Sequence, residues 1–121
     1  MTVKNYTELI VWQKAMDLTV MVYKITKILP KEEIYSLTNQ MRRAAVSVPS
    51  NIAEGQARNS TKEFIHFLGI AQGSIAELET QLLVCNKIGY LSDSDIMDPM
   101  SLAKETVKML NGLISKLSTA H

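Results

Sequence analysis

Glu63-Phe64-Ile65-His66 places a carboxylate and an imidazole three residues apart, on one face of a helix. This Glu-x-x-His spacing occurs in the di-iron sites of four-helix bundles, which need two such motifs and two further inward glutamates. The chain has one motif, and its only other histidine is the last residue, His121. Because Glu63 is also explained as part of a helix cap at Ser60, we expect no metal site.

No side chain has the partners of a catalytic nucleophile. Cys85, the single cysteine, lies in phase with the apolar residues of its helix and is expected to be an inert core thiol. It cannot form an intrachain disulfide, and no Cys/His spacing indicates zinc. Gly69 and Gly73 lie within a helical segment, whereas a phosphate-binding loop needs a turn from a strand to a helix. We therefore expect no enzyme, no cofactor and no small-molecule substrate.

Polar side chains recur along one face of the helix expected around residue 45. Their steps of 3-4-4-3-4 put them in one row, which we call the polar stripe: Gln40, Arg43, Ser47, Asn51, Glu54 and Arg58. Arg42 and Lys62 flank this row, and all three arginines of the chain lie in this neighbourhood.

The polar stripe has two interpretations. One is contact with nucleic-acid phosphates, because guanidinium groups match phosphate oxygens. The candidate residues for that contact are Arg42, Arg43, Arg58 and Lys62. The other is a structural polar network in which Glu54 pairs with Arg58, one turn away. No aromatic residue is interleaved with the stripe, so stacking on unpaired bases is not expected.

The chain has 121 residues and a formal net charge of +1, with 13 Lys and Arg against 12 Asp and Glu. That balance argues against a strongly basic nucleic-acid-binding protein and leaves a local basic patch open. The length suits one domain, residues 1–121, with its own core. No apolar run reaches the length of a signal-peptide core or of a membrane span, so we expect a cytoplasmic protein that contacts no membrane.

Apolar residues recur at steps of three and four in four segments, strictly alternating in all but the second, and they predict helices over roughly 8–29, 32–57, 61–88 and 94–118. The first stripe is Val11, Ala15, Leu18, Val22, Ile25 and Leu29; the second is Ile34, Leu37, Met41, Ala45, Val48 and Ile52; the third is Phe64, Leu68, Ala71, Ile75, Leu78, Leu82 and Cys85; the fourth is Ile96, Met100, Ala103, Val107, Leu110, Ile114 and Leu117. Short connections between such helices predict an all-α fold, an antiparallel up-down-up-down four-helix bundle.

Pro49 lies inside the second segment, where a proline removes one amide and leaves the carbonyl of Ala45 without its donor. We expect the helix to continue with a kink, because Ile52 keeps the apolar phase and Ser47 and Ser50 can compensate locally.

Two helix starts carry signals. Ser60 and Glu63 form a capping box at the start of the third helix. The start of the fourth stays open, because Asp98-Pro99 is typical of an N-cap and first turn while the apolar phase already begins at Ile96.

The first helix is apolar around more of its circumference than contact with one core requires. Trp12, Met16 and Tyr23 lie about 110° to one side of its core stripe. Gly69 and Gly73 on the third helix, one turn apart, would let another backbone approach closely. One interpretation is a wide core contact with a few tolerated exposed side chains. We favour an interface with further copies of the chain, formed by these five residues.

The segment QMRRAAVSVPSNIAEG, residues 40–55, resembles the signature of the four-helix-bundle proteins encoded in bacterial 23S rRNA intervening sequences. Further similarity lies in ELIVWQKAMDLTVMVYKIT near the N-terminus, in KEFIHFLGIAQGSIAELET, and in IGYL before the last helix. The resemblance covers nearly the whole chain.

This resemblance implies a small helical bundle that assembles as a homopentamer, with no established enzymatic activity and no catalytic residues to carry over. Arg42, Arg43 and Glu54 match positions of the signature, and the resemblance supports a second helix that runs through Pro49. A related group, the accessory proteins of diversity-generating retroelements, works with a reverse transcriptase and binds nucleic acid. Those relatives are strongly basic, whereas this chain is near neutral.

Two functional hypotheses follow. The first is a non-enzymatic, oligomeric helical protein that binds RNA, DNA or a ribonucleoprotein through its arginine-bearing surface. The second is a protein–protein interaction scaffold with no nucleic-acid binding. The first hypothesis predicts a nucleic-acid affinity that falls steeply with salt, because binding to phosphates releases condensed counterions. The second predicts no such binding.

Overall fold

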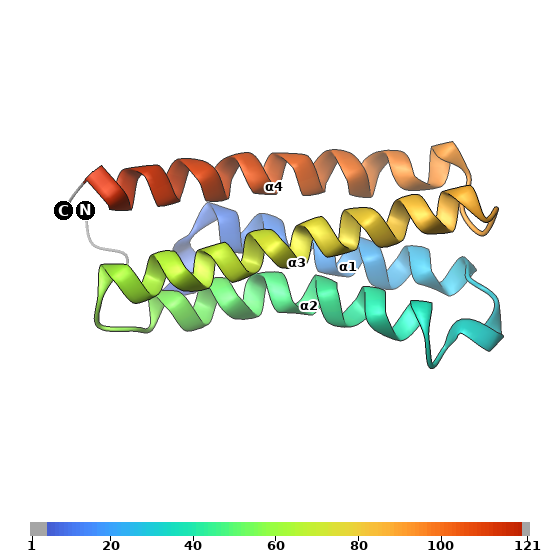
Figure 1. The fold of residues 1–121 in the computed structure, drawn as a ribbon, viewed down its shortest axis with the longest axis horizontal. Helices are drawn as coiled ribbons and strands as arrows, with labels where there is room; N and C mark the ends of the chain where they lie inside the picture. Colours follow the sequence, from blue (N-terminus) through green and yellow to red (C-terminus); the bar gives the residue numbers. More distant parts are fainter. Residues whose placement is uncertain (1–4, 120–121) are drawn as a thin grey trace.

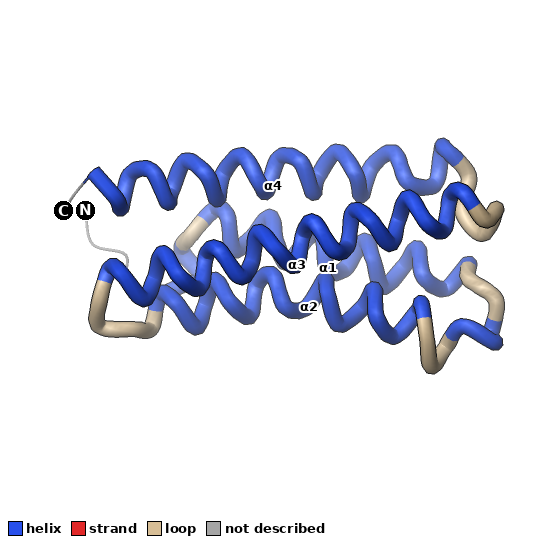
Figure 2. Tube along the Cα trace, viewed as in Figure 1, coloured by secondary structure: helices blue, strands red, loops and turns tan. Residues whose placement is uncertain are grey.

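The computed structural model describes residues 5–119, and every regular element within that range is a helix. The long helices are α1 (Ile10–Ile25), α2 (Leu37–Gln56), α3 (Thr61–Lys87) and α4 (Asp93–Thr119). Three short 3-10 turns are η1 (Tyr6–Glu8) before α1, and η2 (Thr26–Ile28) and η3 (Lys31–Glu33) between α1 and α2. Figure 2 shows the helices joined by short loops. The all-α four-helix bundle predicted from the apolar spacing is confirmed.

Successive helices run in opposite directions along the long axis of the molecule (Figure 1). Each helix packs against two neighbours: α1 against α2 and α4, and α3 against α2 and α4. Within the described range the diagonal pairs, α1 with α3 and α2 with α4, make no such contact, and the contact of α2 with α3 is the most extensive. In cross-section the four helices therefore lie at the corners of a square, and every helix has an outward side that no other helix covers.

The predicted apolar stripes form the core. All six stripe residues of the first helical segment are buried, and α3 is buried at every stripe position from Leu68 to Cys85. On α4 the burial weakens towards the C-terminus, where Ile114 and Leu117 are half-buried against the core. Alternating steps of three and four thus identified the inward side of the helices, as expected for bundle packing.

The close contact of α2 with α3 depends on Gly55, the buried penultimate residue of α2. A Cβ atom at this position would lie 2.7 Å from Cβ of Phe67 and 3.2 Å from the backbone oxygen of Phe64. The first distance is shorter than van der Waals contact allows and the second is tight, so a side chain at this position would push α3 away from the end of α2.

The predicted start of α2 near residue 32 is wrong. Residues 31–33 form a 3-10 turn, and the helix begins at Leu37. The carboxylate of Glu33 accepts hydrogen bonds from the Ser36 hydroxyl at 2.5 Å and from the Leu37 amide at 3.4 Å, and these contacts satisfy donors at the new helix start. Ile34, which the spacing assigned to the core, is 49% exposed because it lies outside the helix.

The helix α2 runs through Pro49, as the apolar phase predicts. The compensation comes from another helix rather than from the neighbouring serines. The Thr19 hydroxyl of α1 lies 3.0 Å from the carbonyl oxygen of Ala45, the group that lacks its helical donor, and 2.8 Å from the carbonyl oxygen of Ala15. One hydroxyl proton is shared between the two carbonyls, and it joins α1 to α2 at the proline.

The starts of α3 and α4 are capped by side chains. The amide of Glu63 donates to the Ser60 hydroxyl at 3.0 Å, which confirms the predicted serine cap of α3. The start of α4, left open by the sequence, is set by a capping box of Ser92 and Asp95. The Asp95 amide donates to the Ser92 hydroxyl at 3.0 Å, and the Ser92 amide donates to the Asp95 carboxylate at 2.9 Å. The helix starts at Asp93, and Pro99 lies inside it.

Candidate functional site

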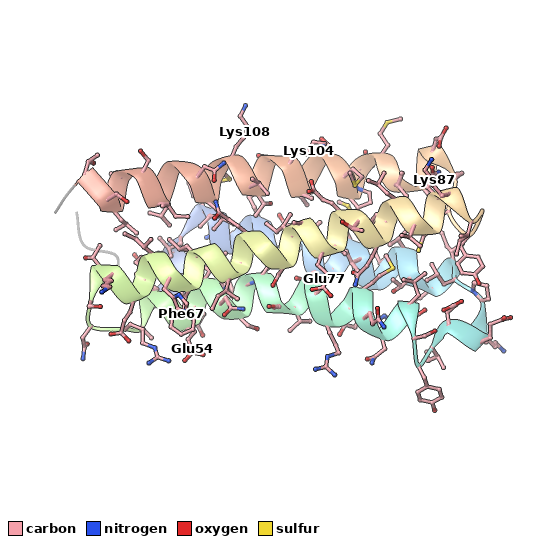
Figure 3. The ribbon with its side chains drawn as sticks, in the orientation of Figure 1. Glu54, Phe67, Glu77, Lys87, Lys104 and Lys108 are labelled. Carbon is pink, nitrogen blue, oxygen red and sulfur yellow. The ribbon has the colours of Figure 1, made fainter. Side chains whose placement is uncertain are left out.

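The polar stripe of α2 borders a groove between α2 and α3, which we call the polar groove. Its volume is about 490 Å³, and its walls come from the loop before α2, from α2 and from α3. The lining residues are Tyr35, Asn39, Gln40, Arg43, Ala44, Ser47, Ser74 and Glu77. Glu77 lies on the side of α3 that faces α2 (Figure 3).

One end of the polar groove is held by hydrogen bonds between the two helices. The hydroxyl groups of Ser47 on α2 and Ser74 on α3 lie 2.8 Å apart. The side-chain amide of Asn51 donates to the carbonyl oxygen and to the hydroxyl of Ser47, at 2.8 and 2.9 Å. This part of the stripe is the structural network that one interpretation of the sequence predicts.

The adjacent residues Arg42 and Arg43 have different surroundings. Nε of Arg42 donates to the hydroxyl of the buried Thr26 at 2.9 Å, and its guanidinium carbon lies 4.7 Å from the ring centre of Tyr23. These contacts join α2 to the end of α1. Arg43 is exposed and makes no hydrogen bond, ion pair or ring contact with any described residue. Its guanidinium is available to a ligand.

Arg58 is paired with acidic side chains. It lies 2.6 Å from a carboxylate oxygen of Glu54 and 3.7 Å from one of Glu63, and its guanidinium stacks over Phe67 at 4.8 Å. Figure 3 shows Glu54 and Phe67 close together near the loop between α2 and α3. The Glu54–Arg58 pair predicted from the sequence is therefore present, and its charges offset one another.

The four candidate cations do not form one patch. Lys62 is exposed near Arg58 in sequence, in the first turn of α3. Arg43 and Arg58 are separated by fifteen residues of α2 and its C-terminal loop, or about 22 Å at the rise of a helix. Of these four residues, only Arg43 has an exposed, unpaired guanidinium and also lines the polar groove.

The candidate interface residues fall on two separate surfaces. Trp12 and Met16 line a second groove, the apolar groove, which lies between α1 and α2 and has a volume of about 340 Å³. Its lining residues are Tyr6, Trp12, Met16, Thr19, Val46, Pro49, Ser50 and Ala53. Tyr23 continues the same side of α1 towards Arg42. Gly69 and Gly73 lie on the open side of α3, where a Cβ would meet nothing within 4 Å.

A further apolar surface was missed from the sequence. Thr80, Leu83, Val84, Lys87 and Ile88 surround a shallow depression of about 370 Å³ on the outer side of α3, which we call the α3 patch. Leu83, Val84 and Ile88 are among the exposed large hydrophobic residues. The sequence does indicate this surface, because these three apolar residues lie off the core stripe of the third helix.

The described residues offer little for reaction chemistry. Between residues 5 and 119, no three His, Cys, Asp or Glu side chains are grouped so that they could hold a metal ion. Cys85 is buried with its Sγ 3.6 Å from Sδ of Met41, and burial raises the pKa of its thiol. A protonated, enclosed thiol is a poor nucleophile. None of the described helices is both long enough and apolar enough to span a membrane.

Comparison with known proteins gives a family. The family model of the 23S rRNA-intervening sequence protein matches residues 7–112. No curated protein sequence matches the chain. A crystal structure of a protein of unknown function from the S23 ribosomal protein family, from Bacteroides thetaiotaomicron VPI-5482, has 24% sequence identity and a TM-score of 0.81. The similarity covers 87% of this chain and 98% of that chain, and it supports the four-helix fold. With the family model matched over most of its length, the chain belongs to the 23S rRNA-intervening sequence protein family.

Proposed function

We propose that the protein is a non-enzymatic helical-bundle module that acts as an assembly of several copies of itself. The observation that carries this proposal is that one subunit leaves two apolar surfaces uncovered, the apolar groove between α1 and α2 and the α3 patch. Contiguous exposed apolar surface on a small bundle is typical of an interaction site.

The occupant we propose for both surfaces is a second copy of the chain. The apolar groove is concave and lies between two helices, whereas the α3 patch is the outer side of one helix. A contact between two different surfaces of the same chain leaves one surface of each kind free at the ends. Repetition closes such an assembly into a ring where the rotation from one subunit to the next is a whole fraction of a turn. A ring of five is the number implied by the sequence resemblance.

The test is the mass of the protein in solution, measured by light scattering after size-exclusion chromatography. The wild type is expected at a multiple of the 13.5 kDa subunit mass. Val46→Glu in the apolar groove and Val84→Glu in the α3 patch are expected to be monomeric, because each buries a charge in the contact. Both side chains are about two-fifths exposed in the subunit, at 40% and 43%, so the fold tolerates the change.

A matched control is Met97→Glu, a change from an apolar side chain to glutamate at a residue of α4 that is 65% exposed and lines neither surface. This variant is expected to keep the mass of the wild type. A wild-type protein that is monomeric at about 100 μM, well above the micromolar range of specific contacts, would overturn the proposal.

The second candidate function is binding of nucleic acid at the polar groove. The observation that favours it is the unpaired guanidinium of Arg43 beside the side-chain amides of Asn39 and Gln40. Guanidinium and amide groups are the side chains that most often contact phosphates and base edges.

Fluorescence anisotropy of labelled RNA tests this second function at about 50 and about 200 mM salt. Binding through Arg43 is expected to weaken with salt and to be lost in Arg43→Ala. Lys108→Ala removes the same charge from the outer side of α4, where Figure 3 shows the side chain pointing away from the bundle, and should leave binding unchanged. Equal loss in both variants would indicate a diffuse charge effect rather than a site.

A further inference from the structure

The polar groove contains an aromatic side chain that the helical pattern had excluded from the polar stripe. If the second helix began at residue 32, Tyr35 would lie about 80° from Arg43 and about 140° from Gln40 around the axis. Because the chain before Leu37 is not α-helical, Tyr35 instead lines the same groove as Arg43. It is 92% exposed, so its ring faces are free for a ligand.

Beside Glu77, the walls of the groove bring three kinds of side chain together. Tyr35 offers an aromatic face at one end, and Arg43 offers a cation that no described side chain neutralises. The amides of Asn39 and Gln40 lie one turn before Arg43 and can donate and accept. A volume of about 490 Å³ is within the range of small-molecule pockets, about 300–1,000 Å³.

Glu77 on the opposite wall limits what the ligand can be. Its Oε2 accepts a hydrogen bond from the side-chain amide of Gln81 at 3.4 Å, and its Oε1 has no donor among the described residues. A carboxylate repels phosphate, so a phosphate must stay on the Arg43 side of the groove. The same carboxylate attracts an amino group, such as the exocyclic amine of cytosine.

We propose that the polar groove binds one unpaired cytidine of a single-stranded RNA, with the base stacked on Tyr35 and its amino group on Glu77. The backbone phosphate lies at Arg43, and the amides of Asn39 and Gln40 contact the acceptor side of the base. This proposal rests on the second candidate function. A base inside a duplex cannot enter the groove, because its faces and its pairing edge are covered. Uracil presents an oxygen where cytosine presents its amine, so it would face the carboxylate unfavourably.

The test uses fluorescein-labelled oligocytidine and oligouridine of about ten nucleotides, within the usual 4–16 of single-strand sites, and an RNA duplex of similar length. At about 50 mM salt and neutral pH, anisotropy is expected to show oligocytidine bound at least about fivefold more tightly than the duplex or oligouridine. Stacking on one aromatic residue corresponds to about fivefold to a hundredfold in affinity.

Four variants separate the contacts. Tyr35→Ala is expected to weaken oligocytidine binding at least about fivefold, whereas Tyr35→Phe keeps the ring and the affinity. Ile34→Ala is the matched control, since this neighbouring side chain is exposed and does not line the groove. Glu77→Gln is expected to reduce the preference for cytidine over uridine, because the amide can also donate to the uracil oxygen.

The outcomes distinguish this proposal from the function on which it rests. Binding that depends on Arg43 but is equal for duplex and single strand, or is unchanged in Tyr35→Ala, overturns the nucleotide site and leaves nucleic-acid binding in place. No binding of any of the three RNAs overturns both.

Discussion

Arg42 and Arg43 are identical side chains at adjacent positions, and their contacts differ completely. Arg42 is held by the Thr26 hydroxyl and the Tyr23 ring, which belong to the end of α1, whereas Arg43 is free at the polar groove. Sequence position cannot separate them, because the partners of Arg42 lie 16 and 19 residues earlier in the chain. A double alanine variant would therefore mix a loss of stability with a loss of ligand contact.

The two arginines form a matched pair for a stability measurement. Arg42→Ala is expected to lower the free energy of unfolding by about 1–2 kcal/mol, because it removes a charge-assisted hydrogen bond and a cation–π contact. Arg43→Ala is expected to change it by less than about 0.5 kcal/mol, as for other surface substitutions. Urea denaturation followed by circular dichroism measures both. Equal losses in the two variants would contradict the assignment of Arg42 to the structure.

Glu33 is the residue whose ionisation matters most for the start of α2. Hydrogen bonds from the hydroxyls of Ser36 and Tyr90 lower the pKa of its carboxyl. The Tyr90 hydroxyl, which belongs to the middle of the turn between α3 and α4, lies 2.8 Å from the Glu33 carboxylate. The same contact raises the pKa of the Tyr90 hydroxyl. A lowered pKa in the folded state means that the ionised carboxylate stabilises the fold at neutral pH.

Glu33→Gln is therefore expected to lower the melting temperature at pH 7. The stabilisation by Glu33 is complete above its unfolded-state pKa, near 4.3 for glutamate, and is lost as the pH falls through the lower folded-state value. Melting curves of the variant and the wild type should converge over that acid range. Glu32→Gln, at a neighbouring carboxylate that accepts no hydrogen bond from the described residues, should follow the wild type throughout. A constant difference between Glu33→Gln and the wild type from pH 7 to pH 3 would exclude the ionised carboxylate as the cause.

At the scale of elements, apolar spacing predicted the helices and their inward sides because it is a local property of each helix. The start of α2 could not be predicted in the same way. It depends on Glu33, whose partner Tyr90 is 57 residues away, and on a non-helical turn that changes the direction of Tyr35. The polar stripe is a repeat within one helix, so it could be predicted from the sequence. The place of Tyr35 beside the polar groove depends on the turn before Leu37, so it could not.

The passage of α2 through Pro49 depends on Thr19 of α1. Thr19→Val keeps the shape of the side chain but leaves the buried carbonyl of Ala45 without a donor, which is expected to cost about 1–3 kcal/mol of stability. Thr119→Val is the control, because the Thr119 hydroxyl contacts only the carbonyl of Lys116 in the exposed last turn of α4. Its effect should be below about 0.5 kcal/mol.

A double-mutant cycle tests directly whether the Thr19 hydroxyl compensates for Pro49 in α2. Pro49→Ala restores an amide that can donate to Ala45, so Thr19→Val should cost less in that background than in the wild type. Chemical denaturation of the four proteins gives the coupling. A cost of Thr19→Val that is the same with and without Pro49 would show that the hydroxyl does not compensate for the proline.

At the scale of the whole molecule, the square section of the bundle explains why assembly surfaces exist. Each helix contacts only two others, so α1 and α3 both keep an outward side, and both sides carry exposed large apolar residues. The residues proposed from the sequence for an interface, Trp12, Met16 and Tyr23 on α1 and Gly69 and Gly73 on α3, lie on helices that do not touch. One subunit cannot unite them, whereas contact between two different subunits can.

Assembly through these surfaces links stability to protein concentration, because association adds its free energy only to the folded state. A tenfold increase in concentration adds about 1 kcal/mol per subunit, which should raise the melting temperature of the wild type by about 3–6 °C. Val46→Glu and Val84→Glu should melt at a temperature that does not depend on concentration, while Met97→Glu should follow the wild type. Scanning calorimetry across a hundredfold range of concentration separates these cases. A concentration-independent melting temperature in the wild type would mean that the apolar groove and the α3 patch receive something other than a second copy of the chain.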